Sequence, residues 1–246
     1  MDIEAASEEL QENIQRARAR IAAAARRVGR DPAEVTLVGV TKTVPASLVR
    51  MAWNLELTDF GENRVQEAVE KIPLVLANDI SEIRNSKFEI HWHMIGHLQR
   101  NKVKYVIPLF DLVHSVDSVR LAREIDKRAG HAGKVMPVLI EVNVAGETSK
   151  YGFAPETVAD AIPQIAELAH VRVRGLMTVA PIAEDPEDVR PHFRRLRRLR
   201  DFLADRFPDI DWHHLSMGMT DDFEIAVEEG ATLVRVGRAI FGQRGE

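Results

Sequence analysis

One lysine stands at the end of an apolar segment where it could carry covalent chemistry. Residues 35–40 are uncharged and rich in β-branched side chains, a pattern typical of a strand covered on both faces, and Lys42 follows this segment. A buried ammonium needs water, an anion or a covalent partner, and a desolvated lysine can attack a carbonyl group. On this segment alone, the simpler interpretation is favoured: a lysine whose charge reaches solvent.

Two glycine-containing segments near the C-terminus could bind a phosphate group. They are SMGMT (216–220) and VGRAIFG (236–242), which follow the last two predicted strands. Ser216 offers a hydroxyl, and Gly218 and Gly237 let backbone N–H groups come close to an anion at the start of a helix. In eight-stranded α/β barrels these are the loops that often hold phosphate. The alternative, that the glycines only form tight turns, stays open.

These residues belong to a regular alternation of strands and helices. The pattern predicts a long helix over 2–28 and then strands at 35–40, 57–60, 89–95, 112–116, 136–144, 171–179, 212–216 and 232–236, separated by helical segments. Eight strands in 246 residues favour a single-domain (β/α)₈ barrel of the TIM type, with an extra N-terminal helix. We predict one domain over 1–246, with residues 1–30 packing on the barrel and 73–88 forming an insertion.

The composition excludes several classes of protein. The chain has no cysteine, which excludes disulfides and thiolate chemistry, and its acidic N-terminal segment does not resemble a transit peptide. Its apolar runs are too short for a membrane span, and a net charge of −5 argues against general nucleic-acid binding. We therefore expect a cytoplasmic protein that acts without membrane or nucleic acid, as a monomer.

The lysine and the phosphate loops would lie side by side in a closed barrel, because its first and eighth strands are neighbours. A ligand with an aldehyde and a phosphate could span them. Pyridoxal 5′-phosphate (PLP) is such a ligand, with Lys42 forming a Schiff base. Arg235 alternates with Leu233 and Gly237, so we expect it to point inward. A permanent cation facing the pyridine nitrogen would disfavour protonation of the ring.

Several long motifs support this hypothesis through a resemblance. They are GVTKTVP (39–45), DFGENRVQE (59–67), WHMIGHLQRNK (92–102), HSVDS (114–118), LIEVNVAGETSKYGF (139–153), GLMTVAP (175–181) and the segment 215–242. Together they resemble the pyridoxal phosphate homeostasis protein family over nearly the whole chain. The resemblance implies a barrel like the N-terminal domain of alanine racemase, with PLP on Lys42. It also implies a role in keeping free PLP available and low, without an established reaction. PLP-dependent apoenzymes would be the recipients.

The same resemblance assigns roles to individual residues. It implies that Asn63 lies near the ring, that Arg235 faces the pyridine nitrogen, and that three residues bind phosphate: Ser216, Gly218 and Gly237. Met217, His214 and Ile95 would line the pocket. The family often has a small hydroxyl residue after the last of these glycines, and here the residue is Arg238. Its backbone N–H can still bind phosphate, and its side chain either contacts the phosphate or points to solvent.

Two enzymatic alternatives stay open beside PLP homeostasis. A PLP-dependent, racemase-like enzyme of low activity needs a base on each face of the ligand. Only Tyr105 and Tyr151 are present, neither follows a strand in an obvious catalytic position, and the second domain of racemases is expected to be absent. A Schiff-base aldolase acting on a phosphorylated sugar usually carries its lysine on a middle strand with carboxylates nearby. Here Lys42 follows the first predicted strand, and most strand ends lack carboxylates. We therefore predict no enzymatic turnover and no catalytic residues.

Two further patterns have ordinary explanations. His91, His93 and His97 lie close together, as do His213 and His214, but we expect hydrogen-bonded histidines and no metal. Residues 190–200 are rich in arginine, yet their apolar residues recur at helical spacing. This spacing predicts an amphipathic helix whose arginines form a solvated face.

Overall fold

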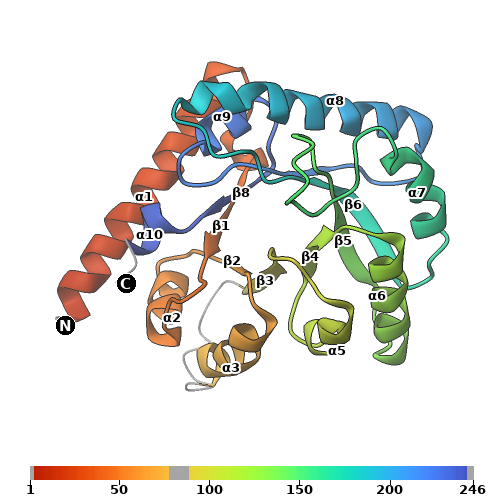
Figure 1. Ribbon diagram of the computed structural model, residues 1–246. Coiled ribbons are helices and arrows are strands. Elements are labelled where there is room, and N and C mark those ends of the chain that lie inside the picture. The colour runs from red at the N-terminus through yellow and green to blue at the C-terminus, as the bar shows by residue number, and fades with distance from the viewer. Residues whose placement is uncertain (1–2, 78–88, 243–246) are drawn as a thin grey trace.

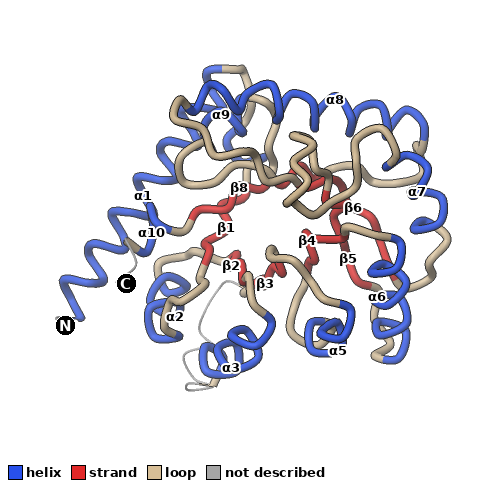
Figure 2. The backbone as a smooth tube through the Cα atoms, in the orientation of Figure 1, coloured by secondary structure: helices blue, strands red, loops and turns tan. Residues whose placement is uncertain are grey.

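A closed barrel of eight parallel strands forms the centre of the molecule. The computed structural model describes residues 3–77 and 89–242. The strands follow one another around the barrel in chain order, and β8 pairs with β1 to close it, with Val38 opposite Arg235 (Figures 1 and 2). They are β1 Thr36–Val40, β2 Asp59–Glu62, β3 His91–Met94, β4 Leu112–Val116, β5 Met136–Glu141, β6 Val171–Met177, β7 His214–Ser216 and β8 Leu233–Val236. The predicted (β/α)₈ barrel is confirmed.

Helices surround the strands on the outside (Figure 2). They are α1 Ile3–Arg27, α2 Ala46–Asn54, α3 Val65–Leu76, α5 Val103–Val106, α6 Val119–His131, α7 Val158–Ala166, α8 Arg190–Arg206, α9 Phe223–Glu228 and α10 Arg238–Phe241, with 3₁₀ turns at Pro32–Glu34, Arg100–Lys102 and Pro186–Val189. This layer brings the carboxyl ends of all strands to one face, where active and binding sites of such barrels lie.

The predicted N-terminal helix packs on the last helices of the barrel. Leu10, Ile14 and Ile21 form its buried face, because they recur at helical spacing. Around this face, Asn13 donates to the carbonyl of Ile240 at 3.1 Å, and Arg20 pairs with Glu224. Figure 1 shows α1 running along the outside beside α9 and α10. The extent of the domain, residues 1–246, stays a prediction.

The boundaries of several elements differ from the prediction. The fifth and sixth strands end at Glu141 and Met177 rather than at 144 and 179, because the apolar residues that follow are buried by loop packing. Helix α3 continues past Pro73 to Leu76, where burial of Val75 holds its last turn. The helical segment predicted between the third and fourth strands is a 3₁₀ turn followed by the short α5. Residues 78–88 of the predicted insertion lie outside the described residues.

The arginines of α8 do not form the purely solvated face that was predicted. Glu229, only 4% exposed, lies within 3.3 Å of Arg190, Arg194 and Arg197, which therefore tie α8 to the end of α9. Burial would raise the pKa of Glu229, but hydrogen bonds from Arg194 and Arg190 outweigh burial and lower it. These charges are thus paired within the protein. Within the described residues, no helix is both long and apolar enough to cross a membrane.

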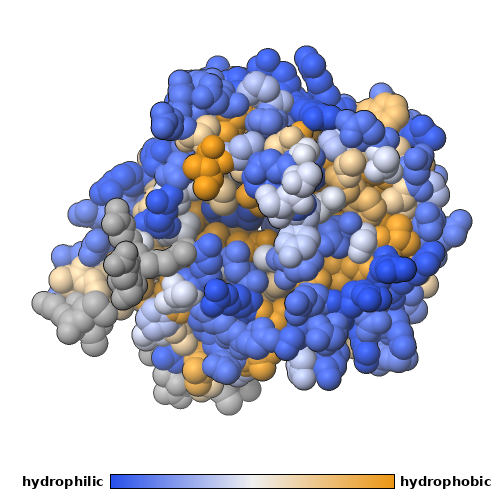
Figure 3. Space-filling model, viewed as in Figure 1, coloured by the Kyte–Doolittle hydropathy of each residue, from blue (hydrophilic) through white to orange (hydrophobic). Residues whose placement is uncertain are grey.

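Hydrophobic packing lies in two separate places. A large cluster fills the layer between strands and helices, and a small one inside the barrel contains Val38, Leu112, Leu139, Met177 and Leu233. Figure 3 shows hydrophobic residues near the middle of the face drawn in Figure 1 and hydrophilic residues over most of its rim. Apolar side chains usually fill the interior of such barrels. Here they leave room for a set of polar residues.

Candidate functional site

A chain of five hydrogen-bonded side chains crosses the barrel interior. We call Asp59, His93, His114, Ser216 and Arg235 the histidine chain. His93 joins Asp59 Oδ1 through Nε2 at 3.0 Å and His114 Nε2 through Nδ1 at 2.9 Å. His114 Nδ1 lies 2.8 Å from the Ser216 hydroxyl, which accepts a 2.6 Å hydrogen bond from Arg235 Nη1. The chain therefore connects Arg235 of β8 with Asp59, the first residue of β2.

Burial sets the charge state at several points of this chain. Desolvation lowers the pKa of fully buried His114 well below its ordinary value, and His93 and Arg235 add to this effect, so His114 is neutral. Desolvation also lowers the pKa of Arg235 to about 10, against the opposing effects of Asp222 and Glu141, so the guanidinium remains charged near neutral pH. Burial would raise the pKa of Asp59, but hydrogen bonds from His93 and Thr58 outweigh it and lower the pKa.

At the carboxyl ends of β1 and β2, charged side chains hold the loop that carries Lys42. Lys71 donates to Glu62 at 2.8 Å, to Glu67 at 2.6 Å and to the carbonyl of Thr41 at 2.6 Å. We call Glu62, Glu67 and Lys71 the ionic clamp. Glu67 also accepts from the backbone N–H of Thr43 at 2.5 Å. The residues on both sides of Lys42 are therefore hydrogen-bonded to the ionic clamp.

The clamp stabilises an unusual backbone conformation. Thr43 has a φ of +64°, a value that is rare for a β-branched residue. Burial raises the pKa of Glu62 above its ordinary value despite its hydrogen bonds from Lys71 and Thr41. Glu67 and Lys71 were not among the residues predicted for the site. Their i, i+4 spacing on a predicted helix was the available signal, but only the fold shows that they reach Lys42.

The structure brings Lys42 together with the loop after β8. A cavity of about 230 Å³ is lined by Lys42, Gly237 and Arg238, with β1 and α2 residues completing its wall. Gly218, with a φ of +93°, packs so closely that a Cβ would lie 2.5 Å from Ala226 Cβ. The side chain of Arg238 pairs with Asp221, which links the loops after β7 and β8. The Arg238 side chain is more than half exposed, and its contact with a phosphate stays a prediction.

The other predicted site residues are spread over different environments. Asn63 lies just beyond β2, and its Oδ1 atom is buried and accepts no hydrogen bond from the residues that the structure describes. Ile95 packs toward Gly61, where an added Cβ would lie 2.8 Å from its Cδ1 atom. His214 starts β7, at the end of that strand away from the mouth, and Met217 is buried in the layer outside the barrel. Their predicted ligand contacts stay predictions.

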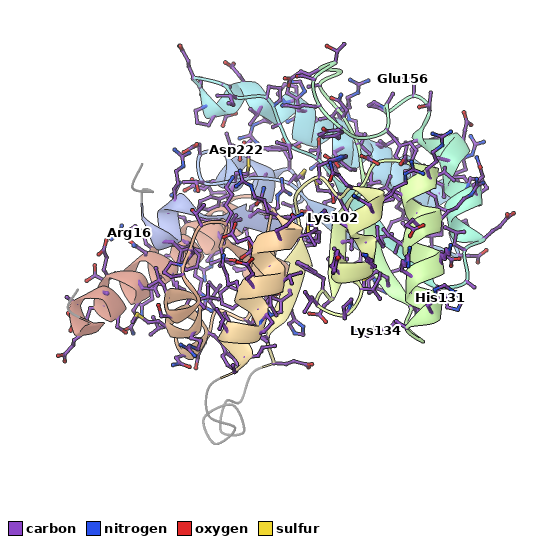
Figure 4. The ribbon with its side chains drawn as sticks, turned by 60° about the horizontal axis from the view of Figure 1, so that its bottom comes forward. Arg16, Lys102, His131, Lys134, Glu156 and Asp222 are labelled. Carbon is purple, nitrogen blue, oxygen red and sulfur yellow. The ribbon has the colours of Figure 1, made fainter. Side chains whose placement is uncertain are left out.

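Histidines and carboxylates also occupy the rim of the mouth. The rings of His97 and Tyr151 are stacked with centroids 3.6 Å apart, and His97 lies 3.2 Å from Asp117, so three loops meet here. Asp222 accepts from the backbone N–H of Met219 at the start of α9 (Figure 4). In the described part of the chain, no group of three or more metal-ligating residues is placed to hold a metal ion.

Comparisons with known proteins relate the chain to two groups. The family model described as "Alanine racemase, N-terminal domain" matches residues 8–245. The pyridoxal phosphate homeostasis protein of Aquifex aeolicus (strain VF5) is 46% identical over 233 residues, which cover 95% of this chain and 97% of that protein.

Solved structures agree with both relations. PipY of Synechococcus elongatus PCC7942 with PLP bound is 33% identical, with a TM-score of 0.77 over 92% of this chain and 99% of PipY. An alanine racemase of Clostridium difficile 630 is 14% identical with a TM-score of 0.67, covering 97% of this chain and 58% of the racemase, so this likeness concerns the fold alone. The chain belongs to the pyridoxal phosphate homeostasis proteins, within the family of the alanine racemase N-terminal domain.

Proposed function

We propose that this protein binds PLP at the carboxyl end of its barrel and takes part in cytoplasmic PLP homeostasis, holding and supplying the cofactor without turnover of a substrate. The observation that carries the proposal is the cavity shared by Lys42, Gly237 and Arg238, because it joins an amine to a phosphate-type loop. The family supports it, since relatives are named for PLP homeostasis and PipY has a PLP-bound structure.

The residues at the mouth fit a ligand of this kind. Asn63 Oδ1 is a buried acceptor without a partner among the described residues, and an unpartnered buried polar atom is costly unless a ligand or water satisfies it. At Gly218 an added Cβ would lie 2.5 Å from Ala226 Cβ, so only glycine lets the backbone of this loop lie against α9.

Each residue then has a defined task. When bound, PLP supplies a reactive aldehyde carbon and a ring that absorbs visible light. Lys42 would bond to that carbon. Ser216 and the backbone at Gly218, Gly237 and Arg238 would hold the phosphate.

Arg235 is the proposed partner of the ring nitrogen. Its guanidinium is held by Ser216 Oγ and by the carbonyl of Thr178 at 2.9 Å. It keeps its proton near neutral pH, because burial lowers its pKa only to about 10. A cation at this position cannot accept a proton from the ring or stabilise a protonated ring nitrogen, which favours holding PLP over using it for catalysis.

Absorption spectroscopy tests the binding proposal. We expect purified protein mixed with PLP to show a visible band that reduction with borohydride traps, and Lys42→Ala to lose both. Lys127→Ala, a substitution of an exposed lysine on α6, is the matched control and should keep the band. No band in the wild-type protein would contradict the proposal.

A racemase-like PLP enzyme of low activity is the second candidate, favoured by the family model that matches residues 8–245. Assays with L- and D-amino acids separate the two candidates. If the wild-type protein turns over an amino acid faster than free PLP does, and Lys42→Ala abolishes this turnover, the protein is an enzyme and the homeostasis proposal is wrong.

We further propose that PLP-dependent apoenzymes receive the cofactor and that the protein acts as a monomer. Mixing the PLP-loaded protein with an apoenzyme, in the presence of a scavenger of free PLP, tests direct transfer. Light scattering during gel filtration tests the monomer. Recovery of apoenzyme activity no faster than with free PLP would contradict direct transfer.

A further inference from the structure

The hydrogen bonds of the histidine chain have a common direction. Arg235 can only donate, and the carboxylate of Asp59 can only accept. Each neutral histidine has one N–H, and the serine hydroxyl has one hydrogen. Since Arg235 donates to Ser216 Oγ, one arrangement satisfies every contact: Ser216 donates to His114, His114 to His93, and His93 to Asp59.

A phosphate ligand changes this arrangement, because phosphate oxygens are acceptors. This step rests on the proposed function, in which Ser216 contacts the phosphate. The serine has a single hydrogen, so a hydroxyl that donates to phosphate no longer donates to His114 Nδ1. His114 keeps a hydrogen bond to Ser216 only if its proton moves to Nδ1, and its Nε2 atom must then accept from His93 Nδ1.

The reversal leaves His93 Nε2 facing the carboxylate of Asp59 at 3.0 Å. Without a proton between them, two acceptors would lie within hydrogen-bond distance, which is unfavourable in a buried site. A proton there balances the chain, either on His93 as imidazolium or on Asp59. The proton comes from water and no covalent bond other than N–H or O–H changes.

We propose that binding of a phosphate-bearing ligand at Ser216 reverses the hydrogen bonds through His114 and His93 and takes up one proton at the His93–Asp59 pair. Ligand binding at the mouth is thereby linked to protonation at the opposite end of the barrel. His93 and Asp59 are positioning residues, because they act on the ligand only through Ser216.

Exposure along the chain supports this location of the proton. The side chain of Asp59 is 17% exposed at the start of β2, whereas His114 and Ser216 are fully buried. Solvent protons can therefore reach the Asp59 end. His114 does not become charged in either arrangement, in agreement with its strongly lowered pKa.

Other charged groups surround the pair. His91 of β3 faces Asp59, whose second carboxylate oxygen accepts from Thr58, and His214 of β7 faces His93. At the far end, Arg235 faces Glu141 and Asp222. Asp59 is thus the carboxylate of the histidine chain, and substituting it tests the proposed proton without changing the other charged groups.

The decisive variant is Asp59→Asn. An asparagine amide can donate to His93 Nε2, so the reversed arrangement forms without an added proton. Asp126→Asn is the matched control, because Asp126 also lies beside a histidine, at 3.5 Å from His170 Nδ1, but outside the histidine chain. The probe is PLP, with inorganic phosphate as the second ligand.

The measurement is ¹⁵N NMR of the imidazole nitrogens, with and without ligand, together with affinity between pH 7.5 and 8.5. In the wild-type protein and in Asp126→Asn we expect both His93 nitrogens to become protonated or to share a proton with Asp59, and His114 to change tautomer. In these two proteins the affinity for PLP should fall, for each unit by which the pH rises, about tenfold more than it does in Asp59→Asn. This is the dependence that one linked proton requires.

The outcomes separate the two proposals. A PLP band with unchanged His93 and His114 signals, and with the same pH dependence in Asp59→Asn as in the wild type, would overturn the proton linkage while PLP binding stands. No PLP band would overturn the proposed function itself. If Asp59→Asn does not fold, the wild-type imidazole signals before and after addition of ligand still decide.

Discussion

Two polar clusters, the ionic clamp and the histidine chain, are held together in different ways. Beside Lys42, the ionic clamp puts one ammonium between two carboxylates, and its hydrogen bonds end on the backbone at Thr41 and Thr43. Across the barrel, the histidine chain joins a guanidinium to a carboxylate through two histidines and a serine. Opposite charges meet directly in the clamp, whereas neutral groups separate them in the chain.

This difference has a physical consequence. Removing one partner of a buried ion pair strongly destabilises the fold. The clamp is therefore suited to hold a strained backbone in one conformation. A chain of neutral donors and acceptors can reverse direction at small cost when one end gains a new partner. We expect the ionic clamp to govern the stability of the fold and the histidine chain to govern the response to ligand.

Lys71→Met should have the largest effect, because it removes the centre of the clamp. It leaves the buried carboxylate of Glu62 unpaired, and breaking a buried ion pair in this way typically costs about 3–5 kcal/mol. Urea denaturation measures this loss. Adding Glu62→Leu should restore a large part of the stability, because no charge is then left buried. A loss below 1 kcal/mol in the single variant would contradict the role of the clamp.

Glu141→Gln tests a buried carboxyl group that faces Arg235 of the histidine chain, and its effect depends on pH. Burial, with a smaller contribution from Asp117, raises the pKa of Glu141 from 4.5 to about 7, so the folded protein holds a proton that the unfolded chain releases. Its contribution is therefore present below pH 4.5 and lost as the pH rises to 7. At roughly 1.4 kcal/mol per pKa unit, the loss is at most about 3.5 kcal/mol.

We expect Glu141→Gln to be stabilised relative to the wild type at pH 8 but not at pH 4.5, as measured by urea denaturation. Glu156→Gln, at an exposed position on the periphery (Figure 4), should follow the wild-type curve. The pKa of His214, lowered by burial to about 4, gives a slope of opposite sign in the same window. Comparison of each variant with the wild type cancels that slope.

Gly218→Ala sharpens the comparison, because it alters the loop above the chain without touching a charge. The new Cβ would lie 2.5 Å from Ala226 Cβ and 2.9 Å from Phe223 Cα. Gly133→Ala is the control, since Gly133 also has a positive φ but its added Cβ would meet no atom of the described residues within 4 Å. Overpacking should cost Gly218→Ala about 1–3 kcal/mol more than the control and weaken PLP binding. Equal thermal stability of the two variants would show that the loop adapts freely.

Arg238→Ala should have the smallest effect. Its guanidinium pairs with Asp221, and both side chains are more than half exposed, so the pair should contribute less than about 1 kcal/mol. If the backbone N–H binds phosphate, affinity for PLP should change less than about threefold at 0.15 M salt. A tenfold loss of affinity in titration would assign the phosphate contact to the side chain.

Much of the fold could be predicted because each strand is a short apolar segment bounded by polar turns. Lys42, Ser216, Gly218 and Gly237 could be selected by their positions after predicted strands. The histidine chain could not, because its members come from five different strands and only closure of the barrel brings them into contact. Alternation showed only that His91 and His93 share a face of one strand.

The sequence by itself determined the barrel, its order of strands and the presence of an amine and a phosphate-type loop on neighbouring strands, because periodicity and turn residues are local properties of the chain. Only the tertiary structure decided what surrounds them. Lys71 reaches the backbone beside Lys42, and His114 reaches Ser216, across 30 and 102 residues of sequence. Such contacts depend on closure of the barrel, which brings side chains together at distances that no local pattern contains.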